Sequence, residues 1–304
     1  MIVGAGLGTR LRPLTHLLPK PAVPVRGLPL VAYPLAMLAS VGVREVVVNT
    51  HHLPEALRDA CRAHCPDGME LQFSHEESLL HTGGAIRRVM EFLRESDPCL
   101  ILGGDMILDL DLAGLIERHR ASDRAATLLL RDDPRAARFG TIGVDGQGRL
   151  RRIAGRFDLG GEQAAGVYTW LNIVSPKAFA SLPDREVFNH LDDWLAPRAS
   201  AVGDVGAEIG SEADTLWIPV GTAEEYLVAN FTEPNLRYLD VPARARARGV
   251  VLGKDRVIGA GATVPASAEL DRVVVWDNER LPEGFRGHDG VFAGGAFHSC
   301  GATA

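Results

Sequence analysis

The stretch GAGLGTRLRPLTHLLPKPAVPV, residues 4–25, follows a three-residue apolar start at the head of the chain. It contains three glycines, two arginines, one lysine and four prolines, and no carboxylate, since the first acidic residue of the chain is Glu45. Glycines let a backbone approach a ligand closely, and prolines stiffen the segment that follows. Free amides and cations without acids predict a pocket for a polyphosphate anion.

Two cations in this stretch are candidates for phosphate contacts. Arg10 ends the glycine-rich part and can fork two phosphate oxygens. Lys20 stands between two prolines, which hold it in a fixed direction, and it is one of only three lysines among 32 basic residues. The glycine spacing is neither that of a dinucleotide fingerprint nor that of a Walker A loop.

The first 131 residues alternate short apolar runs with helical patterns. This alternation predicts an α/β domain with a doubly wound, mostly parallel sheet, in which ligands bind beyond the carboxyl ends of the strands. The expected strands are 47–50, 69–73, 99–104 and 126–130, and the expected helices are 29–42, 54–65, 83–96 and 112–122.

The pattern changes after residue 139. Residues 139–153 predict a hairpin that turns at 145–148. A strand at 167–174, helices at 176–182 and 186–199, a strand at 214–218 and a helix from Ala223 complete a first domain, residues 1–235.

The tail has a different period. Leu252, Ile258, Val264, Leu270 and Trp276 recur every six residues, which is typical of a β-helix with three hexads per turn. We expect residues 245–304 to form a short β-helix. Because so short a prism leaves one end uncovered, it also predicts self-association into a homo-oligomer.

Composition excludes several classes of function. A net charge of −7 argues against a general nucleic-acid binder, and no apolar run approaches the length of a bilayer-crossing helix. The N-terminus lacks a signal-peptide layout. The four cysteines are irregularly spaced, which predicts reduced thiols and a cytoplasmic location.

The motifs resemble those of the sugar-1-phosphate nucleotidyltransferases, in particular the mannose-1-phosphate guanylyltransferase-like branch. The resemblance rests on GLGTRLRPLT with PKPAVPV, on LLHTGGAI (79–86), GGD (103–105), FGTIGVD (139–145) and WIPVGTAEEYLVAN (217–230), and on the hexad tail. It implies a GT-A-like catalytic domain and a left-handed β-helix. It also implies a reaction in which a sugar-1-phosphate and a nucleoside triphosphate give a nucleotide-sugar and pyrophosphate.

The resemblance also implies roles for particular residues. Arg10 would hold the leaving pyrophosphate, Lys20 would bridge the two reacting phosphates, and Asp105 would ligate Mg²⁺, the expected cofactor. The implied nucleotide-binding residues are Gly4, Ala5, Gly6, Gly8, Thr9, Arg10, Glu76, Glu77, Thr82 and Gly83, and the implied sugar-binding residues are Gly140, Glu162 and Trp170.

Other readings of these residues stay open at this point. The alternatives are Arg10 as a surface charge, Asp105 as a helix N-cap or turn residue, and Glu76 and Glu77 as solvated loop charges. Glu162 lies in GGEQAAG, which lacks the Glu-Lys-Pro typical of the resembled family.

The sequence departs from the family pattern at four places. Pro219 stands where the family has a second metal-binding Asp, Trp170 and His81 stand where it has glycines, and its sugar-site lysine is absent. Asp193 or Asp214 are the carboxylates that could substitute. Two hypotheses follow: a working nucleotidyltransferase with one metal-binding carboxylate, or a weakened paralogue that binds a nucleotide or nucleotide-sugar and regulates an active partner.

Overall fold

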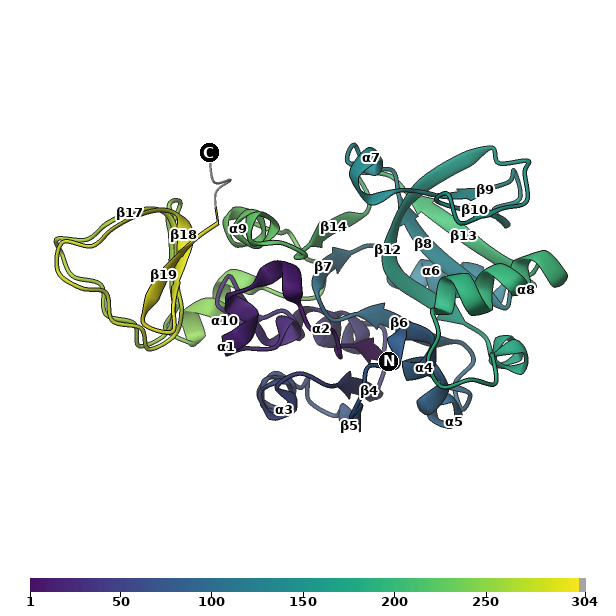
Figure 1. Ribbon diagram of the computed structural model, residues 1–304, viewed down its shortest axis with the longest axis horizontal. Coiled ribbons are helices and arrows are strands. Elements are labelled where there is room, and N and C mark those ends of the chain that lie inside the picture. The colour runs from purple at the N-terminus through teal and green to yellow at the C-terminus, as the bar shows by residue number, and fades with distance from the viewer. Residues whose placement is uncertain (301–304) are drawn as a thin grey trace.

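The parallel half of the central sheet is built as the sequence predicts. The computed structural model describes residues 1–300 (Figure 1). Strand β1 (Ile2–Val3) lies between β4 (Glu45–Thr50) and β6 (Cys99–Gly103), and β5 (Glu70–His75) extends β4 on its other side. All four strands run parallel. Their apolar runs are nearly continuous because both faces of a parallel sheet are covered.

The other half of the sheet is mixed, which corrects the expectation of a mostly parallel sheet. The long strand β12 (Ala164–Val174) runs antiparallel to both β6 and β8 (Ala126–Arg131), and β13 (Val205–Gly210) is parallel to β8. The predicted hairpin is confirmed as β9 (Ile142–Val144) and β10 (Leu150–Ile153), followed by β11 (Phe157–Asp158). Pairing of β9 with the start of β12 joins this hairpin to the sheet.

Helices cover both faces of the sheet, over two large apolar cores. The predicted helix 83–96 is interrupted at Val89, and the predicted helix 176–182 is a 3-10 helix, η3 (Pro176–Ser181). The helices in contact with the sheet and its loops are α2 (Ala32–Ser40), α3 (Pro54–Ala63), α4 (His81–Arg88), α5 (Met90–Leu93), α6 (Leu112–Arg120), α7 (Ala136–Phe139) and α8 (Ala196–Ala201).

The prediction of one helix over 186–199 is wrong in its first part. Regular helix begins only with a π-helix, η4 (Leu191–Leu195), that runs into α8. The preceding residues form irregular, bent chain that packs on α4, where the backbone N–H of Gly83 donates to the Phe188 carbonyl at 2.8 Å. A long-range contact therefore overrides the local helical pattern.

Two short strands that lie far apart in the sequence form a separate ribbon beside the sheet. Strand β7 (Met106–Asp109), absent from the sequence prediction, pairs antiparallel with β14 (Leu216–Pro219). Helix α9 (Ala223–Phe231) follows, and the Thr222 side chain caps it by accepting from the Glu225 backbone N–H.

The glycine- and proline-rich stretch folds into short pieces over the end of β1. They are η1 (Thr9–Leu11), α1 (Leu14–Leu17), η2 (Lys20–Ala22), β2 (Pro24–Val25) and β3 (Leu28–Pro29). Their apolar side chains share one core with α9 and with the C-terminal strands.

The C-terminal segment winds as a parallel coil at one end of the molecule (Figure 1). Helix α10 (Val241–Ala247) and β15 (Val251–Leu252) lead into β16 (Arg256–Ile258), β17 (Glu269–Val275) and β18 (Arg286–Ala293), and β19 (Ala296–Ser299) closes the sheet. Val257 pairs with Val274 and Val274 with Val291, so each pairing advances 17 residues rather than the 18 of three hexads.

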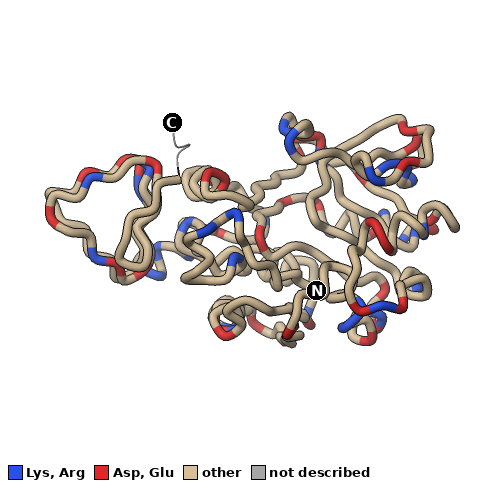
Figure 2. Tube along the Cα trace, in the orientation of Figure 1, with Lys and Arg blue, Asp and Glu red and all other residues tan. Residues whose placement is uncertain are grey.

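Acidic and basic positions alternate around this coil (Figure 2). Its left-handed sense and the domain limits 1–235 and 245–304 stay predictions, and residues 301–304 lie outside the described part. All four cysteines are free thiols, as expected. None of the helices in residues 1–300 is both long and apolar enough to cross a membrane.

Candidate functional site

A cleft of about 390 Å³ opens beyond the carboxyl ends of β1 and β6, where a doubly wound sheet places its ligands. It brings together segments that lie far apart in the chain. The side chains and backbone that line it come from Arg10, Lys20, Asp105, Met106, Phe139, Gly140, Thr141, Ile142, Ile153, Ala154, Arg156, Val167, Tyr168, Trp170, Asn189, His190, Leu191, Trp217, Pro219, Val220, Gly221 and Glu225.

The glycine loop presents unpaired amides at the edge of this cleft. Gly4 is buried and its N–H donates to Asn49 Oδ1 at 2.7 Å, so this glycine anchors the loop. Within residues 1–300, the backbone N–H groups of residues 6–10 have no protein partner. Gly8 has φ +60°, and a β-carbon there would lie 2.8 Å from the Thr15 side chain, so the loop geometry requires glycine.

Lys20 and Asp105 form the polar centre of the cleft. Lys20 Nζ donates to Asp105 Oδ2 at 2.5 Å; the lysine side chain is 11% exposed and the aspartate side chain 41%. Asp105 follows β6 and caps no helix, which excludes the N-cap alternative. Arg10 also lines the cleft and has no carboxylate partner among the described residues, so its guanidinium is available to an anion.

Pro219 lies directly across from this centre. It is the register partner of Met106, and the Val220 N–H donates to the Asp105 carbonyl at 3.2 Å. Neither carboxylate named as a substitute lines the cleft. Asp193 binds the Asn189 N–H and Arg185, while Asp214 binds Thr215.

Glu225 is the second carboxylate of the cleft, and sequence reasoning missed it. Its side chain is buried, with one oxygen accepting from the Gly221 N–H at 2.6 Å and the other paired with Arg138 at 2.9 Å. Both oxygens are thus held by the protein, and Asp105 remains the carboxylate open to a metal. Across residues 1–300 no group of three or more His, Cys, Asp or Glu side chains could hold a metal on its own.

The residues predicted to contact the nucleotide base differ in their surroundings. Glu76 is buried, accepting from Asn49 Nδ2 at 2.7 Å and from the Leu80 N–H at 3.0 Å, so it is not a solvated charge and it fixes the loop after β5. Glu77 is exposed. Gly83 faces its own chain rather than open space, since a β-carbon there would lie 2.2 Å from the Phe188 ring.

Of the residues predicted to bind the sugar, some line the cleft and one does not. Gly140 and Trp170 line the cleft. Glu162 does not: its carboxylate pairs with Arg152 at 2.5 Å, next to Gly143. The structure adds Arg156, Tyr168 and His190 to the lining, which the sequence signalled only as isolated polar residues.

Trp170 and His81, which the resemblance places at glycine positions of the family, both adopt a backbone conformation that suits glycine. Their φ angles are +65° and +56°, in the left-handed region that side chains with a β-carbon disfavour by about 1–2 kcal/mol. Such strain persists where the surrounding structure holds it in place. At Trp170, the residue held in this conformation lines the cleft.

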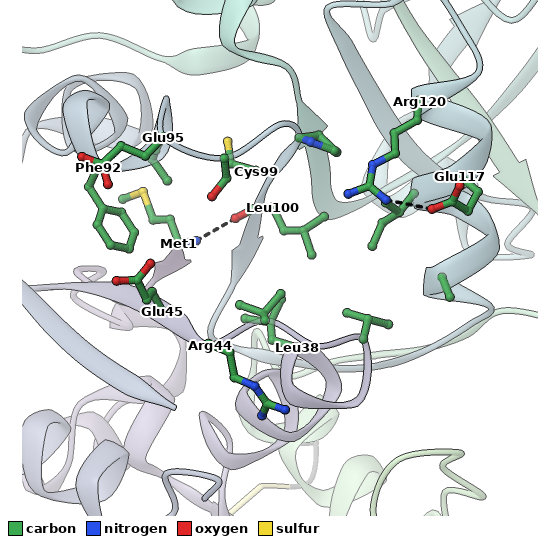
Figure 3. A pocket seen from close by; sticks show the side chains of 17 residues that line it. Met1, Leu38, Arg44, Glu45, Phe92, Glu95, Cys99, Leu100, Glu117 and Arg120 are labelled. Carbon is green, nitrogen blue, oxygen red and sulfur yellow. Dashed lines mark hydrogen bonds and ion pairs between the residues drawn. The ribbon is translucent and has the colours of Figure 1, made fainter. Parts of the chain in front are cut away.

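A second cavity, of about 410 Å³, lies at the opposite edge of the same strands (Figure 3). Its walls mix aliphatic side chains with five charged ones, Arg44, Glu45, Glu95, Glu117 and Arg120, of which Arg120 and Glu117 pair at 2.8 Å. The buried α-ammonium of Met1 donates to the Leu100 carbonyl at 2.7 Å, and burial lowers its pKa to about 6. This edge holds the amino ends of the parallel strands, so the cleft is the better candidate for a ligand site.

The family model described as "Nucleotidyl transferase" matches residues 1–234. This chain belongs to the nucleotidyl transferase family. The matched region contains the glycine loop, Lys20, Asp105 and the ribbon that carries Pro219, and it confirms the resemblance drawn from the motifs.

Characterised nucleotidyl transferases resemble the chain over most of its length. A mannose-1-phosphate guanylyltransferase of Mycobacterium tuberculosis is 31% identical, over 93% of this chain and 81% of its own. A UTP–glucose-1-phosphate uridylyltransferase of Synechocystis is 24% identical, over 83% of this chain and 68% of its own. These relatives are sugar-1-phosphate nucleotidyltransferases with different bases and sugars.

A solved structure has the same fold. HddC from Yersinia pseudotuberculosis, crystallised with GMP-PN, superposes with a TM-score of 0.61 at 25% identity, over 75% of this chain and 96% of that one. Three quarters of this chain thus share the fold of that structure.

Proposed function

We propose that this protein is a nucleotidyltransferase that condenses a sugar-1-phosphate with a nucleoside triphosphate, giving a nucleotide-sugar and pyrophosphate. The observation that carries the proposal is the cleft itself, which holds an unpaired Arg10 and the Lys20–Asp105 pair, with the free amides of the glycine loop next to Lys20. The reaction needs positioning and charge neutralisation more than covalent catalysis.

The geometry supports an in-line displacement. An oxygen of the sugar-1-phosphate attacks the α-phosphorus, and the bond from that phosphorus to the β-phosphate oxygen breaks, releasing pyrophosphate. Arg10 and the amides of residues 6–10 would hold the departing phosphates. Lys20, which is stiffened by its neighbouring prolines and only 11% exposed, would lie between the two reacting phosphates.

The ligand atoms in the cleft suit Mg²⁺. They do not form a complete set of protein ligands around a metal. Mg²⁺ is commonly held by one or two carboxylates together with substrate phosphates and water. Asp105 would supply the one protein carboxylate, and the phosphates of the nucleotide would supply the rest. Bound there, the ion would neutralise charge that develops on the phosphates.

The pair between Lys20 and Asp105 has a consequence for binding. An ammonium 2.5 Å from the carboxylate competes with a metal for the same oxygen. Nucleotide phosphates would offer Lys20 an alternative partner and free Asp105. We therefore expect Mg²⁺ and nucleotide to bind cooperatively, with weak Mg²⁺ binding to the protein alone.

A pyrophosphate-release assay tests the proposal. The full chain is incubated with Mg²⁺, each of the four common nucleoside triphosphates and a set of sugar-1-phosphates that includes mannose-1-phosphate and glucose-1-phosphate. Release from at least one pair, abolished in Asp105→Asn, supports an enzyme. The absence of release across the set, together with tight nucleotide binding, supports the alternative of a regulatory paralogue weakened by Pro219.

A further inference from the structure

A surface cavity of about 620 Å³ lies where the β2–β3 turn and the end of α9 meet α10 and the segment that follows it. It shares no lining residue with the cleft. Three cations and one carboxylate stand in its walls beside apolar side chains. We call it the turn cavity, and its lining includes Arg26, Phe231, Glu233, Arg246, Leu252 and Lys254.

Arg26 stands at a turn position that disfavours arginine. Strands β2 and β3 pair Val25 with Leu28, so Arg26 and Gly27 form a two-residue hairpin loop. Both residues have positive φ, +49° and +77°. Loops of this kind favour asparagine or glycine at the first position, because other side chains strain the left-handed backbone. Strain of this kind is concentrated at sites where a side chain must be aimed.

The turn is held rigidly by the elements on both sides of it. The Arg26 backbone N–H donates to Asn230 Oδ1 of α9 at 2.8 Å, and the Gly27 carbonyl accepts from the Arg248 guanidinium. A β-carbon on Gly27 would lie 2.7 Å from the Val250 side chain. The backbone that carries the arginine is therefore fixed before any ligand arrives, which lowers the cost of binding.

The guanidinium of Arg26 is buried without a counter-ion. The residue is 7% exposed and has no carboxylate partner within residues 1–300. Its Nη1 donates to the Asn230 carbonyl at 3.0 Å, while Nε is buried without a partner. Nη2 also has no partner among these residues and, unlike Nε, is not fully enclosed. The carbonyl at the end of α9 supplies only a partial negative charge, so an anion would lower the cost of burying this cation.

The other charges of the lining do not neutralise one another. Arg246 and Lys254 are exposed and form no ion pair within residues 1–300, and the same holds for Glu233. Arg272 lies 5.9 Å from the Phe231 ring but is paired with Asp289 at 2.8 Å, so it adds no free charge. Three cations against one carboxylate leave an excess of two positive charges in the lining.

We propose that the turn cavity is a second anion site, separate from the cleft, which binds a small phosphorylated molecule. Arg26 Nη2, Arg246 and Lys254 would bind the phosphate oxygens, because guanidinium and ammonium groups make charge-assisted hydrogen bonds to them. The organic part would lie on the apolar walls, to which Val250 and Leu252 belong. The site does not depend on the proposed nucleotidyl transfer, since the two cavities have no residue in common.

Calorimetric titration of the full chain with phenyl phosphate, inorganic phosphate and phenol tests this proposal. We expect phenyl phosphate to bind more tightly than inorganic phosphate, and phenol not to bind. Asparagine suits the first turn position, so Arg26→Asn removes the guanidinium while keeping the hairpin. The affinity for phenyl phosphate should fall about tenfold or more in this variant.

Arg246→Gln is the second variant, because its exposed side chain forms no ion pair within residues 1–300 and its loss leaves the turn intact. It should also weaken the binding of phenyl phosphate. Arg244→Gln changes an exposed arginine of α10 outside the lining, and both it and Arg10→Gln should leave the affinity unchanged. The proposal is overturned if neither phosphate binds, if phenol binds as tightly as phenyl phosphate, or if Arg10→Gln abolishes binding that both cavity variants retain.

Discussion

The two edges of one sheet carry different chemistry although the same strands reach both. At the carboxyl edge, Arg10 is unpaired, Lys20 and Asp105 pair with each other, and Trp170 is strained. At the amino edge, aliphatic and charged side chains line a cavity of similar volume, with Arg120 and Glu117 forming an exposed pair (Figure 3). Neither size nor an exposed unpaired arginine identifies a site, since Arg44 at the amino edge also has no carboxylate partner within residues 1–300; the partly buried Lys20–Asp105 pair, the glycine-dependent backbone and the strain do.

The largest effect should follow from the carboxylate of the cleft. Asp105→Asn removes the charge that faces Lys20 and would hold Mg²⁺, so kcat should fall by about a hundredfold or more, equivalent to about 2.7 kcal/mol. Pyrophosphate release at saturating substrates measures this change. Retention of more than a tenth of the wild-type rate in Asp105→Asn would remove the carboxylate from the mechanism.

The close contact between Gly83 of α4 and Phe188 predicts a large effect of substitution on stability. Gly83→Ala places a methyl group 2.2 Å from the Phe188 ring and 2.8 Å from its carbonyl oxygen, so the free energy of unfolding should fall by about 1–3 kcal/mol. Urea unfolding measures it. Gly155→Ala is the matched control, since no atom lies within 4 Å of its β-carbon. Equal stabilities of the two variants would contradict the packing of 186–188 on α4.

Acid should lower the free energy of unfolding through His190, which lines the cleft. Burial lowers its folded pKa to about 3, below the ordinary 6.5, so the unfolded state binds a proton first as the pH falls. The stabilisation is complete above about pH 6.5 and is lost progressively towards pH 3, reaching about 2 kcal/mol of loss at pH 5. Urea unfolding of the wild type and His190→Gln at pH 7 and pH 5 measures this slope.

The variant His190→Gln should lose less stability between these two pH values than the wild type does. An exposed histidine provides the control, because His16→Gln should leave the wild-type slope unchanged. An identical slope in His190→Gln and wild type would contradict a neutral, buried ring.

A substitution at the amino edge of the sheet should have the smallest effect on stability and activity. Glu117→Gln breaks an exposed i,i+3 pair, which contributes at most about 0.5 kcal/mol to stability. Neither pyrophosphate release nor nucleotide affinity should change. A loss of activity comparable to that of Asp105→Asn would show that the two edges had been ranked wrongly.

Local chemistry made part of this site predictable from the sequence. The glycine loop, Arg10, Lys20 and Asp105 were predicted because each stands in a short motif whose residue types suit phosphates or a metal. Arg10, Lys20 and Asp105 lie in one cleft, and their roles stay predictions. Trp170 was found as a departure from glycine, and its φ of +65° explains why that position is unusual.

Long-range packing explains what the sequence did not reveal. Glu225 enters the cleft because α9 follows the β7–β14 ribbon, and β7 itself has no distinct pattern after the β6 run. His190 lines the cleft and is held there by contacts with Thr82 and Tyr168, which are distant from it in the sequence. Glu162 was predicted to bind the sugar but lies outside the cleft lining. Its carboxylate pairs instead with Arg152 of β10, which the sequence pattern did not reveal.

Calorimetric titration of the Mg²⁺ complexes of the common nucleoside triphosphates tests the central claim most directly, with wild type, Arg10→Gln and Arg44→Gln compared side by side. Arg44 lines the cavity at the amino edge and serves as the matched arginine. We expect at least one triphosphate to bind, with affinity at least tenfold weaker in Arg10→Gln and unchanged in Arg44→Gln. Absence of heat with every triphosphate, or equal affinities in the three proteins, would contradict a triphosphate site at the glycine loop.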